Sequence, residues 1–244
     1  RWNSISYWIY SNKYDNDTND NTMHWGVQNG PSIYTALSGS DIEVGVNTGN
    51  GEKLGISVSK VTLEGKWSHW VWVWKGNDNA NDTAMNQSTD ADVYVYLNGE
   101  RHVATYVQGT NSNDLDTLAN SDLTLGTTHS ASNYFFQGGI TEVCSWKYKL
   151  TNAHVEELYN DGKAFNALNH SNISNLTGYW RNNGLAPWTN LVNPGTNDGT
   201  VTCSETLLLP AGVDASRDTQ GFLMNRQKDT NALNLVDTGD SDNQ

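Results

Sequence analysis

The chain has 244 residues, of which 36% are hydrophobic and only 17% carry a charge. This length provides a hydrophobic core for one large domain or two small ones. Acidic residues outnumber basic ones by 27 to 14, which gives a formal net charge of −13. Nucleic acids and anionic membranes are poor partners, because binding them needs clustered lysine and arginine, which the sequence lacks. The sequence has no apolar run of the ~18 residues that a membrane span needs.

Segments in which apolar and polar residues alternate dominate the first two thirds of the chain and predict β-strands. In chain order they cover 4–11, 41–47, 54–59, 67–75, 92–97, 100–107, 123–125 and 140–148. Asn98 and Gly99 lie between two of these segments, and this pair is typical of a tight β-hairpin turn.

A single stretch, 149–163, has helical spacing. Val155, Leu158 and Tyr159 lie at positions i, i+3 and i+4, Asn152 is a candidate N-cap, and Gly162 can end the helix. Many short strands with one short helix predict an all-β fold, an antiparallel β-sandwich of the jelly-roll type.

The last third of the chain is less regular. We expect the jelly roll to cover 1–163, a linker with accessory strands to cover 164–205, and an extended C-terminal arm that leads into further sequence to cover 206–244. The linker is predicted from the polar stretch FNALNHSNISNL. Two cysteines, Cys144 and Cys203, allow either one disulfide or two buried thiols, so they do not reveal the compartment.

The stretch GKWSHWVWVWKG (65–76) places Trp70, Trp72 and Trp74 on one face of a strand, about 6–7 Å apart. This row of indoles is either a stacking platform for a ligand or a wall of the core. Burying an indole contributes up to roughly 4–6 kcal/mol, which favours the core. Such bulk needs small residues across the sandwich, and the glycines at 45, 55 and 139 are candidates.

His69 alternates with the tryptophans and shares the opposite face with Val71 and Val73. We expect a packed, hydrogen-bonded histidine there. Because that face is also apolar, we expect the strand to be central and covered on both sides, with the C-terminal arm as a candidate cover.

Several segments in order resemble the laminin-G-like branch of the concanavalin A-like lectin/glucanase jelly-roll superfamily. They are SISYWIY, GKWSHWVWVWKG, DVYVYLNGE, SDLTLG, FFQGGITEVCSW and KLTNAHVEELYNDGK, and together they cover about 1–163. The resemblance implies a lectin-like sandwich. More loosely, LLLPAGVDASRDTQGFLMNR (207–226) resembles structural proteins of tailed viruses.

Glycoside hydrolases of this superfamily place carboxylates on alternate residues of one strand, where they act as general acid and nucleophile. Asp41 and Glu43 come nearest to this pattern, and they are more simply solvated surface. The sequence has no G-x-S-x-G nucleophile motif either. We therefore expect no enzymatic activity.

Calcium is a candidate cofactor, because two acidic loops supply the oxygen ligands that this cation prefers. The candidate metal ligands are Asp15, Asp17, Asn19, Asp78 and Asp82. Solvated acidic turns are the alternative. The resemblance counts against calcium, because the superfamily usually has aspartate where this chain has Thr141.

Aromatic residues with a polar atom are abundant: ten Trp and eleven Tyr stand against four Phe. Such side chains suit sugar faces and wet interfaces. Those near predicted loops are the candidate ligand-binding residues, and packing is the alternative for each: Trp25, Tyr34, Tyr106, Tyr134 and Trp188.

Together these features predict a non-catalytic surface module, a virion appendage or decoration component that adheres to a glycan or host surface. Its location would be extracellular or on the virion surface, with neighbouring subunits of an assembly as further partners. The alternatives are a purely structural particle subunit and a glycoside hydrolase.

Overall fold

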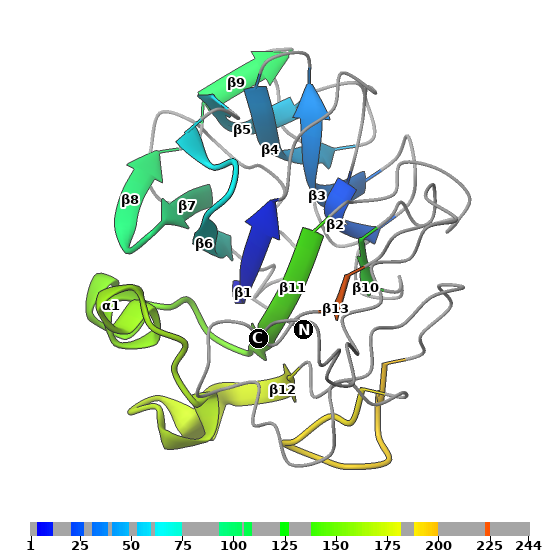
Figure 1. Cartoon of the computed structure of the whole chain (residues 1–244), viewed down its shortest axis with the longest axis vertical. Helices are drawn as coiled ribbons and strands as arrows, with labels where there is room; N and C mark the ends of the chain where they lie inside the picture. The colour runs from blue at the N-terminus through cyan, green and yellow to red at the C-terminus, as the bar shows by residue number, and fades with distance from the viewer. Residues whose placement is uncertain are drawn as a thin grey trace, which may run out of the picture.

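The structure, a computed structural model, describes residues 4–11, 21–26, 31–38, 41–48, 53–59, 62–74, 93–103, 105–108, 123–126, 138–181, 188–199 and 223–224. In this part of the chain two antiparallel β-sheets are accompanied by one α-helix and short 3₁₀ turns (Figure 1). The predicted all-β architecture with one short helix is confirmed.

The first sheet is built around the N-terminal strand. Its strand order is β12-β11-β1-β6-β7-β8, and β13 also pairs with β11. The bounds are β1 (Ser4–Ser11), β6 (Trp67–Trp74), β7 (Val93–Leu97), β8 (Glu100–Val103), β11 (Gly138–Trp146), β12 (Leu176–Trp180) and β13 (Leu223–Met224). Because β1 lies between β6 and β11, the start of the chain and its later part meet in one sheet.

The second sheet has the order β10-β2-β3-β4-β5-β9. Its strands are β2 (Asn21–Gly26), β3 (Pro31–Ser38), β4 (Asp41–Thr48), β5 (Lys53–Ser59), β9 (Thr105–Gln108) and β10 (Leu123–Leu125). The sequence patterns missed β2 and β3. The single strand predicted over 100–107 was wrong, because the chain changes sheets there: β8 belongs to the first sheet and β9 to the second.

The tryptophan row of β6 is part of the core. Trp70 and Trp72 are fully buried, and the register places Tyr7 and Ile5 beside them on the same face of β1. Trp70 Nε1 donates a hydrogen bond to Ser68 Oγ at 3.0 Å. The core interpretation is thus confirmed for these two indoles; the side chain of Trp74 lies outside the described residues.

The glycines do not supply the expected small partners. Gly55 alternates with Ile56, whose side chain is buried, so Gly55 and its register partner Gly45 lie on the other face of their sheet. Gly139 pairs with Tyr10, which shares the face of β1 opposite to Tyr7. Strand alternation therefore places none of the three glycines on a face that is directed toward the buried indoles: Gly45 and Gly55 lie on the outer face of the second sheet, and Gly139 lies on the other face of the first.

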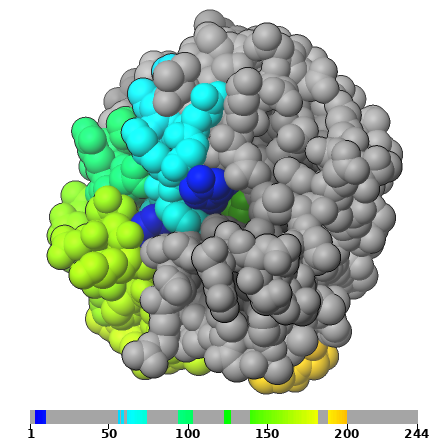
Figure 2. Space-filling model, in the orientation of Figure 1, coloured from blue at the N-terminus to red at the C-terminus, as the bar shows by residue number. Residues whose placement is uncertain are grey.

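The other face of β6 is covered by the helix α1 (Asn152–Tyr159) and the segment after it. Val71 and Val73 are fully buried there. They belong to one apolar cluster, which comprises Val71, Val73, Tyr96, Cys144, Trp146, Leu150, Val155, Leu158, Ala167, Leu176 and Tyr179. Two-sided burial of β6 is as predicted, and α1 provides this cover. In Figure 2, atoms of 93–103 (green) lie directly against those of the helical segment (yellow-green).

The sequence predicts a linker with accessory strands over 164–205, and the described part of this segment contains an accessory strand and buried residues. It contains two 3₁₀ turns, Ala167–Asn169 and Ile173–Asn175, and then β12. Ala167 and Tyr179 are fully buried in the cluster beneath α1. A few apolar residues are thus enough to pack this polar segment against the first sheet. Of the predicted arm over 206–244, only β13 lies within the described residues, where it pairs with Gly139 and Ile140 of β11.

The core position of Trp72 can be tested by truncation. Trp72→Ala should lower the free energy of unfolding by about 3–5 kcal/mol, because it removes a fully buried indole. Tyr148→Ala is the matched control, since Tyr148 is 57% exposed and its loss should change stability by less than about 0.5 kcal/mol. Guanidinium denaturation followed by fluorescence measures both. Equal stabilities of the two variants would contradict the core assignment.

The predicted Asn98-Gly99 hairpin turn joins β7 to β8, with φ of 52° at Asn98 and 81° at Gly99. A Cβ added at Gly99 would lie 2.9 Å from Tyr159 Cδ1, whereas Gly65, with φ of 67°, has nothing within 4 Å. Both glycine-to-alanine changes carry the left-handed backbone cost of about 1–2 kcal/mol. Gly99→Ala should lose about 1 kcal/mol more in denaturant titrations, because it also displaces the Tyr159 ring. If Gly65→Ala is the more destabilising change, the proposed contact is wrong.

Candidate functional site

One row of residues crosses the whole second sheet. The register pairs Thr124 of β10 with His24, His24 with Tyr34, Tyr34 with Gly45, Gly45 with Gly55, and Gly55 with Thr105 of β9. Directly paired residues of antiparallel strands share a face, so these six form one row, here called the Tyr34 row. Figure 1 shows the strands that the row crosses, from β10 to β9.

The Tyr34 row lies on the face of the sheet opposite to the core. Ile56 is only 8% exposed and follows Gly55 directly, so the two occupy opposite faces. The rows that share the face of Ile56 are mostly apolar: one joins Ile56 to Val44 and then Thr35, and the next joins Leu54, Val46 and Ile33. The rows that share the face of Tyr34 carry small and polar residues, namely Gly26, Ser32, Asn47 and Lys53 on one side and Ala36, Glu43 and Ser57 on the other.

The arrangement suits the close approach of a flat polar molecule. Neighbouring strands lie ~4.8 Å apart, so the row spans about 14 Å from β2 to β5. Glycine within a strand often marks a place where a ligand or another backbone approaches closely. Here Gly45 and Gly55 are paired directly beside Tyr34. The row therefore places one tyrosine next to two glycines, and the flanking rows add serine and asparagine together with one residue of each charge.

The structure separates the five aromatic candidates. Trp25 pairs with Ile33, and Tyr106 pairs with Leu54, so both occupy the face of Ile56. Tyr34 alone among the described candidates lies on the opposite face. Trp188 is 6% exposed and pairs through its backbone with Gly199, with N–O distances of 3.0 and 2.7 Å, so its burial favours the packing alternative. Tyr134 lies outside the described residues.

Sequence reasoning missed the other members of the Tyr34 row. His24, Gly45 and Gly55 show no motif, because the row runs across strands and its members are far apart in the chain. The available signal was the pairing of two strand glycines with a tyrosine, which becomes visible only with the strand order.

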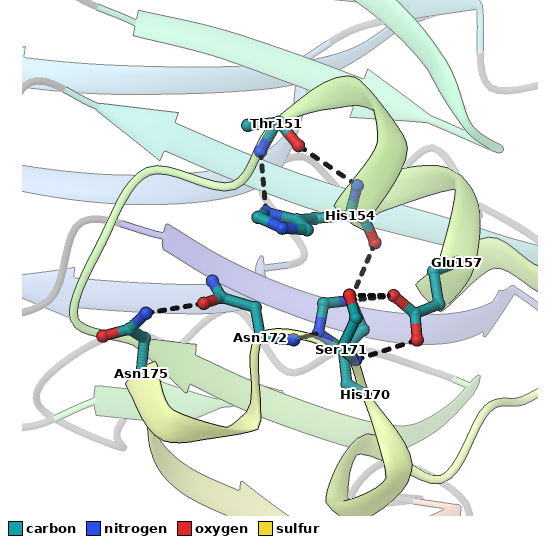
Figure 3. A network of polar contacts seen from close by, with 7 residues as sticks. All are labelled: Thr151, His154, Glu157, His170, Ser171, Asn172 and Asn175. Atoms are coloured by element: carbon teal, nitrogen blue, oxygen red, sulfur yellow. Dashed lines mark hydrogen bonds and ion pairs between the residues drawn. The ribbon is translucent and has the colours of Figure 1, made fainter.

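Ser171, His170 and Glu157 lie together beside α1 and have the residue types of a serine–histidine–carboxylate triad (Figure 3). Their geometry, however, is not that of a nucleophilic site. Ser171 Oγ donates to Glu157 Oε2 at 2.5 Å, and Ser171 N donates to Glu157 Oε1 at 2.9 Å. His170 uses both ring nitrogens for backbone contacts, at the amide of Asn172 and the carbonyl of His154. Because the hydroxyl donates to a carboxylate and both nitrogens of His170 are used by backbone groups, the arrangement is not that of a serine activated by histidine, and the network is structural.

A second buried polar cluster surrounds a bulge in β11. Glu142 has φ of 52° and is 4% exposed, and it accepts hydrogen bonds from the Tyr179 hydroxyl and from Arg181 Nε, the latter at 3.0 Å. Burial raises the pKa of Tyr179, and Glu142 raises it further, so the phenol stays protonated. Cys144 is a free, buried thiol whose pKa is raised by burial and by Glu142. The sequence allows either a disulfide or two buried thiols, and Cys144 is a buried free thiol. Cys203 lies outside the described residues.

The candidate calcium ligands Asp15, Asp17, Asn19, Asp78 and Asp82 all lie outside the described residues, so calcium binding stays a prediction. Within the described residues no three His, Cys, Asp or Glu side chains come together to hold a metal. Thr141, which stands where the superfamily usually has aspartate, is 5% exposed on β11. A single buried hydroxyl there does not provide the oxygen set that calcium needs.

His69 is packed as predicted, but its ring is held by stacking. The imidazole lies 5.0 Å from the Trp8 ring and 6.1 Å from the Tyr159 ring, and Nδ1 is buried without a hydrogen-bond partner. The hydrogen bonds of His69 are made by its backbone, whose amide donates to Asn98 Oδ1 at 2.9 Å. Burial lowers the pKa of the imidazole to about 3, so the ring is neutral near pH 7.

The sequence profile of the concanavalin A-like lectin/glucanases superfamily matches residues 3–156. The chain belongs to this superfamily. No curated protein sequence matches the chain. No helix within the described residues is long and apolar enough to cross a membrane.

Solved structures with similarity to this member of the superfamily come from different settings. Domain 4 of a GH43 extracellular arabinanase from Geobacillus stearothermophilus, in complex with arabinotriose, is 21% identical, with a TM-score of 0.44 over 65% of this chain and 66% of that one. A tailspike domain of bacteriophage CBA120 is 14% identical, with a TM-score of 0.48 over 72% of this chain and 26% of the other. A pentraxin from Limulus polyphemus is 13% identical, with a TM-score of 0.41 over 65% and 70%.

The buried His69 should make the fold sensitive to acid. Below pH 6.5 the unfolded chain binds a proton at this residue, whereas the folded chain does not bind it until about pH 3. Stability should therefore fall as the pH is lowered through this window, by up to about 1.4 kcal/mol per pH unit. Above pH 6.5 the residue should have no such effect.

His69→Phe keeps an aromatic ring in the stack and removes the titration. Between pH 7 and pH 4 it should lose about 3 kcal/mol less stability than the parent in urea titrations. His102→Gln on β8 is the control and should follow the parent. If the stability of His69→Phe falls with pH as steeply as that of the parent, buried His69 is not the cause of the acid sensitivity.

Proposed function

We propose that the domain is a non-catalytic glycan-binding module and that its sugar-binding face is the Tyr34 row. The observation that carries the proposal is the continuous row from β10 to β9, in which Tyr34 stands beside the paired Gly45 and Gly55 on the face away from the core. Membership of a lectin-containing superfamily supports the same function. A pyranose ring would stack on the tyrosine, and hydroxyl and amide groups of the flanking rows would bind its hydroxyls.

The charge of the protein narrows the class of glycan. The net charge is −13, and the rows beside Tyr34 contain Glu43 and Lys53, one residue of each sign. Sulfated, sialylated and uronic-acid polymers would meet long-range repulsion from the whole molecule. Neutral polysaccharides fit the face better, since they are bound by hydrogen bonds and stacking.

The biological setting belongs to the same proposal. The resemblance of 207–226 to structural proteins of tailed viruses supports a virion appendage or decoration component that adheres to a host glycan, displayed outside a cell or on a particle. Neighbouring subunits of such an assembly are its further partners. A purely structural subunit is the alternative, and a protein that forms a defined oligomer and binds no glycan would favour it.

Binding is tested by an array of neutral and anionic glycans, followed by calorimetry on the best neutral hit. Tyr34→Ala should weaken that binding at least tenfold, because stacking on an aromatic ring is lost. Gly45→Val should weaken it similarly, because the added side chain occupies the row. Thermal melts must show that both variants stay folded.

Tyr148→Ala is the matched control, because it removes a tyrosine that is 57% exposed in the turn after β11. It should bind like the parent. If folded Tyr34→Ala retains full affinity, the Tyr34 row is not the site. A preference for anionic glycans would contradict the charge argument.

A glycoside hydrolase remains the second candidate for one reason. Asp41 and Glu43 alternate on β4 and share the face of the Tyr34 row, about 6–7 Å apart along the strand. The proposal of a non-catalytic module expects no sugar release from polysaccharides that bind. Release that disappears in Glu43→Gln would replace the module by an enzyme.

A further inference from the structure

The helix α1 is joined to the turn after it by a compact set of side chains, here called the histidine lock. It consists of Thr151, His154, Glu157, His170 and Ser171, and Figure 3 shows these side chains together with Asn172 and Asn175. Two of the five are histidines, and both use a ring nitrogen as a hydrogen-bond acceptor.

His170 is held as one neutral tautomer. Its Nδ1 accepts a hydrogen bond from the Asn172 amide at 3.0 Å, so this nitrogen carries no proton. Its Nε2 lies 3.0 Å from the carbonyl oxygen of His154 and therefore donates to it. The ring is 1% exposed and packs 4.7 Å from the Trp146 ring. A proton added at Nδ1 would face the Asn172 N–H and break that bond.

His154 also uses Nδ1 as a hydrogen-bond acceptor, and its contacts with Thr151 fix the start of α1. Its Nδ1 accepts from the backbone amide of Thr151 at 3.3 Å, and its own amide donates to Thr151 Oγ1 at 3.3 Å. This is a capping box in which histidine takes the place of the usual glutamate or glutamine. Protonation of this ring nitrogen removes half of the cap, because the imidazolium has no acceptor.

The charged groups around His170 are few. From α1 it faces His154, at a ring distance of 5.5 Å, and Glu157, whose Oε2 lies 3.4 Å from Nε2. From β11 and from the segment after α1 it faces the uncharged rings of Trp146 and Phe165. Glu157 attracts an imidazolium, and burial opposes it more strongly, so the pKa of His170 lies below its ordinary value of 6.5.

The pKa of the Glu157 carboxyl lies below its ordinary value. Burial raises the pKa of its carboxyl, but the two hydrogen bonds from Ser171 together with the nearby His170 and His154 outweigh this and bring it below the ordinary value of 4.5. Because this carboxyl stays ionised above its ordinary pKa of 4.5, Glu157 keeps its bonds to Ser171 at pH 5.5.

We propose that the histidine lock is an acid-operated latch, which holds the segment 167–175 against α1 at neutral pH and releases it when His170 is protonated. The open form would expose part of the apolar cluster that α1 and Ala167 cover, including Trp146, Val155 and Leu158. The latch lies on the first sheet and the Tyr34 row on the second, so this inference does not depend on the proposed function.

The direction of the effect follows from proton linkage. The open form binds protons at His170 more readily than the closed form, so the closed form loses favour as the pH falls below 6.5. Each proton taken up on opening shifts the closed-to-open ratio by up to about tenfold per pH unit. Above pH 6.5 the latch should be insensitive to pH.

Hydrogen exchange measured by mass spectrometry at pH 7.5 and pH 5.5, with correction for the intrinsic pH dependence of exchange, tests the latch. Amides of 151–175 should lose up to about tenfold in protection at the lower pH. The measurement is made in the His69→Phe background, which removes the global effect of that residue, so that amides of β1 and β6 should keep most of their protection. An NMR titration of His170 should give a midpoint below 6.5.

Two substitutions remove the titration and keep part of the contacts. His154→Gln restores the common capping-box residue, and His170→Gln keeps a donor for the His154 carbonyl. The double variant should show equal protection of 151–175 at both pH values, whereas the control His102→Gln should respond like the parent.

A double variant that still loses its protection in acid would overturn the proposal. So would a parent whose segment 151–175 is equally protected at both pH values. If the double variant does not fold, the NMR titration decides: a His170 midpoint at or above 6.5 contradicts the latch, and one below it supports the latch.

Discussion

The structure depends on the burial of β6 from both sides. Trp70 and Trp72 fill the space on one face, and Val71 and Val73 lie under α1 on the other, all with no exposed surface. Burying apolar surface on both faces fixes the register, because a slip by one residue would exchange the indoles with the valines. It also fixes the neighbours: β1 and β7 flank β6, and the helix must return to the sheet after β11.

This constraint separates the structural aromatics from the candidate site. Trp70 and Trp72 of β6 are buried, and so is Trp188. The abundance of tryptophan therefore reflects packing of the core. The second sheet has one apolar face toward the core, and alternation leaves the Tyr34 row on the other. The proposed glycan face and the histidine lock therefore lie on different sheets and have separate physical origins, one in strand register and one in helix capping.

Much of the fold was predictable because its signals are local. Alternation located most strands, Asn98-Gly99 located a hairpin, and the spacing of Val155 and Leu158 located the helix. The errors arose where tertiary contacts decide. The segment 100–107 looks like one strand but serves two sheets, and the polar segment after α1 looks like a linker but docks through Ala167 and His170. Tyr34 was a candidate because of its residue type and its expected place near a loop, but it lies within β3, and its partners in the row were not predicted.

The sequence by itself determined the all-β class, the superfamily and the burial of the tryptophan strand, because periodicity and the hydrophobic effect act over neighbouring residues. Only the tertiary structure decided which residues share a face. Gly45 and Gly55 read as space for tryptophan, and strand order places them beside Tyr34 instead. His154 and His170 are sixteen residues apart, and only the return of the chain onto α1 brings them together. Pairing across strands and docking between segments join residues that no local pattern connects.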